Sequence, residues 1–393
     1  MRYNLDQVID RKDTNSLKWE FMGHLAPGCP EGTLPLWVAD MDFPCPKSVI
    51  EALHARVDRR IFGYSSHRNE AFMAAVTGWY LRRFGWSIPP EDLLYSPGIV
   101  PAVGYLLEIL TRPGDGVIIQ SPVYYPFESM IRHHGRETVA NPLKDDDGYY
   151  TMDFDGLERK AAEPETKLLV LCSPHNPVGR VWKEEELRRL GEICFAHGVT
   201  VISDEIHCDL VRRGVKHIPL KTLFPEQSRR IITCTAPSKT FNMAGMLFSN
   251  VIIHDPDLKT AWDGLVNKQL GLFMPHSLSI VAVEAAYNEG EEWLEQIIDY
   301  LDGNLAFLGN FLQKHLKRAR YRLPEGTYLA WIDLRSYGNE EEILPRLIRE
   351  GRVLVEGGSI FGAGGKGYIR LNAACPRSIL EEALRRMAGV LEG

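Results

Sequence analysis

Residues 199–245 read VTVISDEIHCDLVRRGVKHIPLKTLFPEQSRRIITCTAPSKTFNMAG and contain two short apolar runs, each followed closely by a charged residue. The first run, VTVISD (199–204), ends at Asp204, and the second, RIITCT (230–235), leads into a turn that contains Lys239. Short runs that are apolar throughout are typical of strands buried on both faces of a sheet. The stretch therefore predicts two strands of a mostly parallel sheet with an acidic and a basic side chain at their carboxyl ends, where open α/β sheets bind ligands.

The same pattern extends on both sides of this stretch. Further strand candidates are GVIIQ (116–120), KLLVLCS (167–173) and NVIIH (250–254). Helical spacing of apolar residues appears in EAFMAAVTGWYLRRFG (70–85) and EEELRRLGEICFAHG (184–198). Alternating strands and helices predict an α/β large domain over residues 61–284, with helices on both faces of the sheet.

The pattern changes beyond about residue 285. Long amphipathic helix patterns over 293–317, 341–351 and 378–393 surround the strand candidates TYLAWIDL, RVLVEG and GYIRLN. This composition predicts a smaller α+β domain over residues 285–393. We expect residues 1–60 to fold back as an N-terminal segment that joins this small domain.

Composition and charge narrow the class of function. The chain has 393 residues, a net charge of −7 and a pI of about 6.0, and no run rich in Lys and Arg, so neither nucleic acid nor an anionic membrane surface is indicated as a partner. The amino terminus lacks the apolar core of a secretory signal, and no stretch has the roughly 20 apolar residues of a membrane helix. Seven scattered cysteines without a CxxC pair are typical of reduced thiols. We expect a cytoplasmic protein that acts on a small molecule.

Metal and dinucleotide sites are not indicated. His133 and His134 are adjacent, and Asp204 with His207 offers only two ligands of mixed type, so no zinc site has its usual spacing. The motif GxGxxG does not follow any early strand, which argues against a dehydrogenase. His207 lies one helical turn beyond Asp204; it either orients that carboxylate by a hydrogen bond or is an ordinary half-buried histidine.

Three motifs occur in order along the chain: NPVGR with Asn176, SDEIH with Asp204 and SKTFNMAG with Lys239. Together they resemble fold type I enzymes that use pyridoxal 5'-phosphate (PLP), within the aminotransferase class I/II superfamily. The segments YNLDQVIDRKDTNSLKW, LPLWVADMDFPCP, SPGIVPAV and YIRLNAACP resemble most the MalY/PatB-type cystathionine β-lyases, or C–S lyases. The resemblance covers essentially the whole chain. It implies a mostly parallel seven-stranded sheet in the large domain and a homodimer whose active sites are shared between subunits.

The resemblance also implies how the cofactor is held. Lys239 would form the Schiff base, for which the amine must be neutral during part of the cycle, and Asp204 would keep the pyridine nitrogen protonated. Asn176 would donate to the phenolate oxygen of the ring. The phosphate would meet the N–H groups of Gly98, Ile99 and Val100 at a helix start, together with the hydroxyl of Ser238.

Further roles carry over by motif. Tyr124 resembles the catalytic aromatic residue that stacks on the cofactor ring, and Tyr64 resembles the tyrosine that reaches the phosphate of the other subunit. Arg370 resembles the arginine that binds the substrate α-carboxylate, with Asn176 beside it. The residues Trp37, Val38, Ala39 and Asp40 resemble the segment that borders the substrate pocket.

Each of these residues also has a purely structural interpretation. Lys239 alone would be a solvated loop lysine, Asp204 a helix N-cap, and Asn176–Pro177 an ordinary turn. Tyr124 and Tyr64 could be packing residues, and Arg370 could pair with a surface carboxylate. The order of the motifs along the chain favours the cofactor roles.

Two positions depart from the aminotransferase pattern. Many members of the superfamily have a serine three residues before the Schiff-base lysine and an arginine eight residues after it, both serving the phosphate; here the residues are Ala236 and Leu247. These departures favour α,β-elimination from cystathionine or a related cysteine S-conjugate, giving a thiol, pyruvate and ammonia. The alternatives are an aminotransferase that acts on an amino acid and a 2-keto acid, and a PLP-fold protein that serves as a regulator or binding module.

Overall fold

The computed structural model describes residues 2–393. Its largest element is a seven-stranded sheet in the order β2 (Leu93–Ser96), β10 (Ser249–Ile253), β9 (Ile231–Thr235), β8 (Thr200–Asp204), β7 (Thr166–Cys172), β3 (Gly116–Ile119) and β4 (Glu137–Ala140). Strand β10 runs antiparallel to both of its neighbours, and the other pairs are parallel. The predicted seven-stranded, mostly parallel sheet is therefore confirmed.

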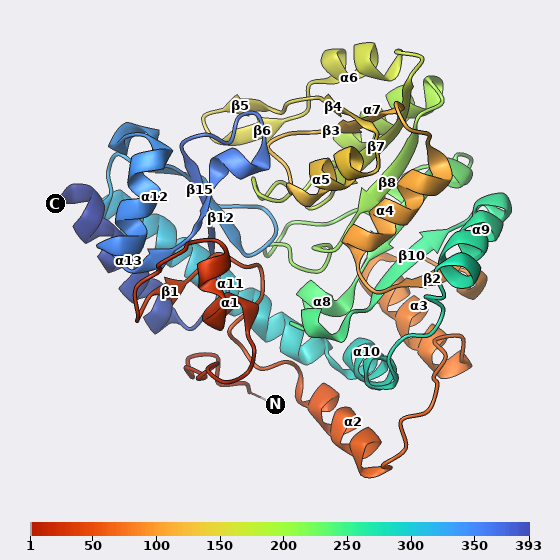
Figure 1. Ribbon diagram of the computed structural model, residues 1–393, viewed down its shortest axis with the longest axis horizontal. Helices are drawn as coiled ribbons and strands as arrows, with labels where there is room; N and C mark the ends of the chain where they lie inside the picture. The colour runs from red at the N-terminus through yellow and green to blue at the C-terminus, as the bar shows by residue number, and fades with distance from the viewer. Residues whose placement is uncertain (1) are drawn as a thin grey trace.

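Helices cover both faces of this sheet (Figure 1). In β8, Ile202 packs into a cluster with α4 (Ile99–Leu110) and α5 (Pro126–His133), whereas Val201 packs with α7 (Glu184–Ala196). Successive strand side chains point to opposite faces, so a strand buried on both faces must be apolar at every position. This requirement explains why the central strands were visible in the sequence.

A second, four-stranded antiparallel sheet has the order β11 (Arg320–Tyr321), β12 (Leu329–Asp333), β15 (Tyr368–Asn372) and β14 (Glu356–Gly357). Helices α12 (Glu340–Arg349) and α13 (Arg377–Glu392) contribute to the core beside it. The predicted strand over 352–357 is divided into β13 (Val353–Leu354) and β14, which belong to different sheets.

The N-terminal segment reaches both parts of the molecule. Strand β1 (Leu34–Pro35) pairs in parallel with β13, and Figure 1 shows the chain near α1 (Leu17–Glu20) beside the C-terminal elements. Helix α2 (Lys47–Asp58) packs instead on α10 (Ser277–Glu289). The domain boundaries at residues 60 and 284 stay a prediction.

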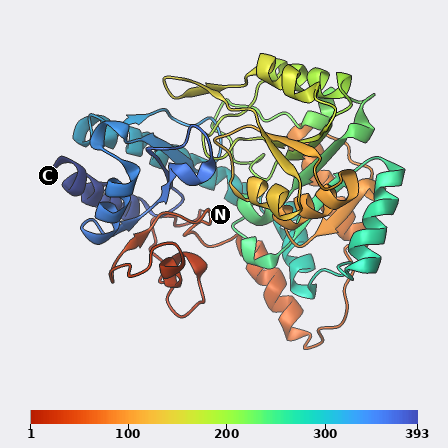
Figure 2. The same cartoon turned by 45° about the horizontal axis from the view of Figure 1, so that its top comes forward.

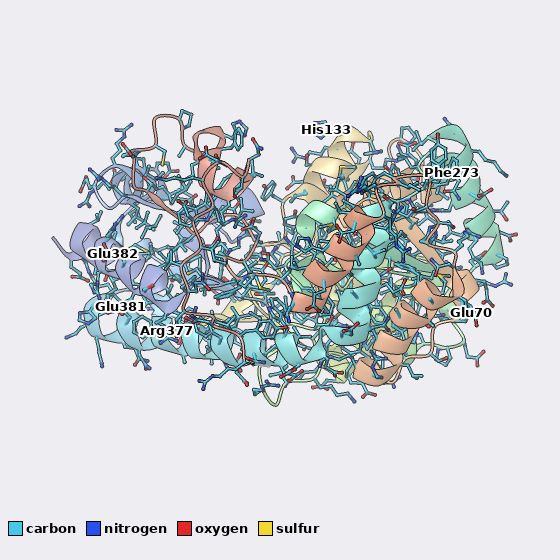
Figure 3. All side chains as sticks on the ribbon, turned by 90° about the horizontal axis from the view of Figure 1, so that it is seen from below. Glu70, His133, Phe273, Arg377, Glu381 and Glu382 are labelled. Carbon is cyan, nitrogen blue, oxygen red and sulfur yellow. The ribbon has the colours of Figure 1, made fainter. Side chains whose placement is uncertain are left out.

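Helix α11 (Glu291–His315) connects the two cores, and Figure 3 shows it running along one side of both. Its first half packs Trp293 and Ile297 into the core of the large part, and its second half packs Leu305 and Leu312 against the small sheet. Because one continuous helix serves two cores, the position of the small sheet relative to the large one is constrained at this helix.

A hairpin made of β5 (Lys144–Asp146) and β6 (Tyr149–Thr151) extends from the large part toward the small sheet (Figure 2). The Tyr368 hydroxyl donates to Asp145 at 2.8 Å, and Arg320 pairs with Asp147 at 3.2 Å. These contacts join the two parts on the side of the small sheet where this hairpin lies.

The sequence did not reveal several of the shorter elements. Strands β4 and β5 carry mostly exposed or half-buried side chains, so they lack the apolar run of a central strand. Helix α3 (Glu70–Phe84) was predicted, and it ends at Gly85, whose φ of 65° favours glycine in this left-handed cap. Within residues 2–393, no helix is both long and apolar enough to cross a membrane.

Candidate active site

A pocket of about 430 Å³ lies at the carboxyl ends of the central strands. It is lined by twelve of the predicted site residues, namely Trp37, Val38, Ala39, Gly98, Ile99, Val100, Tyr124, Asn176, Asp204, Ser238, Lys239 and Arg370. Residues that are far apart in the sequence therefore converge on one cavity. Tyr64 is the predicted residue that this pocket does not contain.

Lys239 lies on the short helix α8 (Pro237–Thr240), directly after β9. Its ammonium group donates a hydrogen bond to the carbonyl of Ala39 at 2.6 Å. Enclosure by protein disfavours the charged amine and lowers its pKa to about 8; Arg370 acts in the same direction, and Asp40 opposes both. Near neutral pH, part of the population of an amine with this pKa is in the neutral form.

Asp204 ends β8 and is buried, with 4% of its surface exposed. Its Oδ1 atom accepts the N–H of Ile206 at 3.0 Å, and burial raises the pKa of the carboxyl to about 7. Among the described residues no cation pairs directly with it. A positively charged group placed in the pocket beside Asp204 would restore its ionised form.

Arg370, on β15, makes three kinds of contact in the pocket wall. Its guanidinium donates to Asn176 Oδ1 at 3.0 Å and to the carbonyl of Trp37 at 3.2 Å. It also forms an ion pair with Glu356 of β14. Asn176, in the loop after β7, uses its oxygen in this contact, so its amide N–H groups are left for the pocket; the Asn176–Pro177 bond is cis.

Glu356 is a pocket residue that the sequence reasoning missed. It is the single acidic residue in the apolar run RVLVEG, and it lies directly across from Arg370 in the β14–β15 register. The available signal was a single charged residue within an apolar, strand-like run, followed by a predicted strand that contains Arg370. Its significance depends on strand pairing, which the run alone does not reveal.

The segment Trp37–Ala39 contributes main-chain carbonyls to the pocket wall. The Val38 carbonyl accepts from Asn372 at 2.6 Å, and the Ala39 carbonyl accepts from the Tyr328 hydroxyl at 2.7 Å as well as from Lys239. Asn372 and Tyr328 were also missed by the sequence reasoning. The segment is thus held by side chains from the small sheet and positions the two basic groups, Lys239 and Arg370.

A network of ion pairs holds the main chain next to the segment Trp37–Ala39. Lys18 is fully buried and pairs with Asp42 at 2.8 Å and Asp40 at 3.6 Å, and Arg11 pairs with both carboxylates. Because the Lys18 ammonium also donates to the Asp40 carbonyl, the network fixes the main chain next to Ala39.

The positions predicted to bind the phosphate lie at two helix starts. Gly98 is the N-cap of α4, and Ile99 and Val100 form its first turn, where backbone N–H groups have no acceptor within the helix. Ser238 lies in the first turn of α8. Leu247 stands where many aminotransferases have an arginine. It lines the pocket with 63% of its surface exposed, and as an apolar residue it supplies no cation.

Tyr124 lies two residues before the start of α5, with its ring edge-on to Phe127 at 5.5 Å. Burial raises the pKa of its phenol, so the hydroxyl stays protonated at neutral pH. The ring lines the pocket from the side of β3, where an aromatic face could cover a bound ring.

His207 is fully buried, not half-buried, and in the described chain no hydrogen bond joins it to Asp204. Burial lowers its pKa to about 3, with smaller contributions from Lys239 and Arg370, so its ring is neutral. It packs edge-on to Tyr328. Neither of the two roles considered for His207 matches this arrangement, since the residue is a buried, neutral part of the pocket wall.

Tyr64 lies outside the pocket, with 93% of its surface exposed. It lines a separate surface hollow together with Arg68, Lys268, Phe273 and Met274. A single chain therefore does not bring Tyr64 to the other site residues. Residues 2–393 contain no group of three or more His, Cys, Asp or Glu side chains that could hold a metal ion.

The donor set fits PLP. Asp204 is a buried carboxylate without a cation, Lys239 offers an amine of lowered pKa, and the start of α4 offers free N–H groups for an anion. A mostly parallel sheet that carries these groups at its carboxyl ends defines a PLP-dependent enzyme of fold type I.

The comparisons with known proteins give the family. The model of the family "Aminotransferase class I and II" matches residues 32–387, and the chain belongs to this family. It is 42% identical to cystathionine β-lyase PatB of Bacillus subtilis, over 99% of this chain and all of that protein.

Solved structures agree with this assignment. Cystalysin from Treponema denticola, which contains a PLP cofactor, matches with a TM-score of 0.96 and 37% identity, over all of this chain and 99% of that one. The PLP-bound C–S lyase from Staphylococcus hominis matches with a TM-score of 0.94 and 36% identity, with the same coverage. The protein is a PLP-dependent enzyme similar to C–S lyases, as the sequence motifs indicated.

Proposed function

We propose that this protein is a C–S β-lyase that converts L-cystathionine or a related cysteine S-conjugate, with one water, into a thiol, pyruvate and ammonia. One observation carries the proposal: the amine of Lys239, whose pKa is lowered to about 8, lines the same 430 Å³ pocket as the guanidinium of Arg370. A base and a carboxylate-binding group thus lie together, as proton removal next to a carboxylate requires. The similarity to PatB supports this choice of reaction.

Each pocket residue has a defined task. Arg370 binds and orients the α-carboxylate, with Asn176 holding the guanidinium at 3.0 Å. Asp204 would pair with the cationic ring nitrogen of the cofactor, and that charge would favour the ionised form of this buried carboxylate. PLP, when bound, supplies the electron sink that stabilises negative charge at the substrate Cα.

Lys239 is the proton carrier. Its Nζ atom accepts the proton from Cα, after which the bond between Cβ and sulfur breaks and the electron pair leaves with the sulfur as a thiolate. An unperturbed thiol has a pKa of about 8.5, so the thiolate is an adequate leaving group. Hydrolysis of the remaining three-carbon enamine gives pyruvate and ammonia.

An aminotransferase would use the same residues, and it differs in where the proton goes. In that reaction Lys239 would return the proton to the cofactor, and a 2-keto acid would be consumed. Leu247 and Ala236 favour the lyase, since neither supplies the phosphate contacts that many aminotransferases have at these positions.

The test is to mix the PLP-loaded protein with L-cystathionine, without any keto acid, and to follow pyruvate and homocysteine together. Equimolar release over many turnovers, abolished in Lys239→Ala, is the expected result. Turnover that begins only when a keto acid is added would establish the aminotransferase instead. A cofactor absorbance band without turnover on any amino acid would favour a regulator or binding module.

We also propose that the protein is a homodimer in which Tyr64 of one subunit serves the phosphate site of the other. Exposed apolar side chains lie near Tyr64 among polar ones: Ile61, Phe62 and Phe273 are 72%, 58% and 47% exposed, and Phe273 lies at the edge of the molecule in Figure 3. Such a patch is typical of an interface between subunits.

Subunit mixing tests the shared site. Tyr64→Ala and Lys239→Ala proteins should each be weakly active or inactive, and a mixed dimer should regain one intact site. Recovery of activity on mixing, together with a dimer mass by sedimentation, is expected. A monomeric, fully active protein would contradict the proposal.

A further inference from the structure

Arg370 is proposed to bind the substrate carboxylate, yet it already forms an ion pair with Glu356. The two residues lie opposite each other in the register of β14 and β15, and 4% and 2% of their surfaces are exposed. Both line the pocket that contains Lys239. The guanidinium that should receive the substrate is therefore already neutralised by a carboxylate of the protein.

A count of charges in the pocket shows the consequence. Its cations are Lys239 and Arg370, and its anions are Asp204 and Glu356, with Asp40 close behind Lys239. In the proposed reaction the cofactor engages Lys239 and Asp204, which leaves the pair of Arg370 and Glu356 for the substrate. The α-amino group of an amino acid goes to the cofactor, so its α-carboxylate meets this neutral pair, and two carboxylates then share the single guanidinium of Arg370.

A further positive charge from the substrate would be favourable beside these two carboxylates and a further carboxylate costly, because burial makes an uncompensated charge costly. Burial already raises the pKa of Glu356, with Arg370 and Lys239 acting in the opposite direction. The other titratable groups that interact electrostatically with Glu356 are the phenols of Tyr124 and Tyr125, which are neutral. Apart from Arg370 and Lys239, which the cofactor engages, no protein cation lines this pocket within the described chain.

We infer that Glu356 determines specificity: it favours S-conjugates whose leaving thiol carries an ammonium group and disfavours those whose leaving thiol ends in a carboxylate. This inference rests on the proposed function and narrows it to a class of substrate. L-Cystathionine carries both an ammonium and a carboxylate group on its homocysteine half, so it lies between the two classes. S-(3-Carboxypropyl)-L-cysteine, whose leaving thiol ends in a carboxylate, belongs to the disfavoured class.

The experiment uses four conjugates with the holoenzyme and measures pyruvate release. S-(3-aminopropyl)-L-cysteine and S-(3-carboxypropyl)-L-cysteine have chains of similar length and opposite terminal charge. S-propyl-L-cysteine is the neutral reference, and L-cystathionine is the fourth. The readout is the ratio of kcat/KM for the amine over the carboxylate conjugate, because any general effect on α-carboxylate binding cancels in this ratio.

The wild-type ratio should exceed one, and Glu356→Gln should lower it roughly tenfold or more, since close charge pairs in desolvated sites couple at least this strongly. Glu356→Asp keeps the charge and should retain part of the preference. The control is Glu340→Gln, which alters another buried carboxylate that contacts Ser359 and Gly367 and does not line the pocket. Its ratio should equal that of the wild type.

Two results would overturn the inference. The first is an equal ratio in Glu356→Gln and the wild type, which would mean that Glu356 only positions Arg370. The second, which needs no variant and holds even if Glu356→Gln fails to load cofactor, is a wild-type enzyme that processes the carboxylate conjugate as well as the amine. Absence of pyruvate from all four conjugates would instead refute the proposed lyase function itself.

Discussion

Replacing Lys18 with methionine tests whether the buried charge network behind the active site stabilises the fold. Lys18 is fully buried, and its ammonium contacts Asp42 at 2.8 Å and the Asp40 carbonyl at 3.1 Å. Methionine has a similar length, so the substitution removes the charge without leaving a large cavity. Asp42 would then remain buried with one of its cations gone.

The expected loss in the free energy of unfolding depends on the partners that Asp42 retains. Breaking a buried ion pair by removing one partner costs roughly 3–5 kcal/mol. Asp42 retains Arg11 at 2.9 Å and the indole N–H of Trp19 at 2.8 Å, so we expect the lower end, about 3 kcal/mol of the free energy of unfolding.

Lys47→Met is the matched control, because Lys47 and its partner Glu51 are 56% and 61% exposed. An exposed pair of this kind contributes about 0.5 kcal/mol or less. Urea unfolding of the holoenzyme, followed by tryptophan fluorescence and circular dichroism, measures both variants. Equal losses in the two variants would refute the view that burial makes the Lys18 network stabilising.

Three further predictions concern the pocket. The apoenzyme should bind PLP at a rate that rises about tenfold per pH unit below about pH 8 and levels off above it. The reason is that only the neutral Lys239 amine attacks the aldehyde, and burial lowers the pKa of this amine to about 8. A rate, measured by stopped-flow absorbance, that levels off only near pH 10 would contradict this prediction. Asp204→Asn should lower kcat roughly 30-fold or more at saturating cofactor, since it removes the charged partner of a buried pair, and a loss under threefold in pyruvate release would count against its role. Arg370→Lys should raise the KM for S-propyl-L-cysteine roughly tenfold or more because the two-pronged contact with the carboxylate is lost, whereas an unchanged KM would move the carboxylate site elsewhere.

The central part of the fold could be predicted because its strands obey a strong local rule. Strands β7, β8 and β9 are buried on both faces, and so each is a short apolar run in the sequence. The outer strands follow no such rule. Strand β5 is exposed along its length, and its hairpin is recognisable as a bridge to the small sheet only when Asp145 meets Tyr368.

The site residues divide in the same way. Asn176, Asp204 and Lys239 stand directly after buried strands, so their common edge could be inferred before any coordinates. Glu356, Tyr328 and Asn372 become part of the site through the small sheet and through carbonyls of residues 37–39. The partners of Tyr328 and Asn372 are hundreds of residues away, and Glu356 meets Arg370 only through the pairing of two strands, which the local sequence does not specify.

The sequence by itself determined the sheet class, most of the residues that meet in the pocket and the family, because motifs at strand ends and apolar periodicity are local properties of a chain. Only the tertiary structure decided that His207 is buried without a hydrogen bond to Asp204, that Tyr64 lies outside the pocket of its own chain, and that Glu356 neutralises Arg370. The physical reason is that charge pairing and burial depend on distances in space. Those distances are set when the small sheet and the N-terminal segment pack against the large domain.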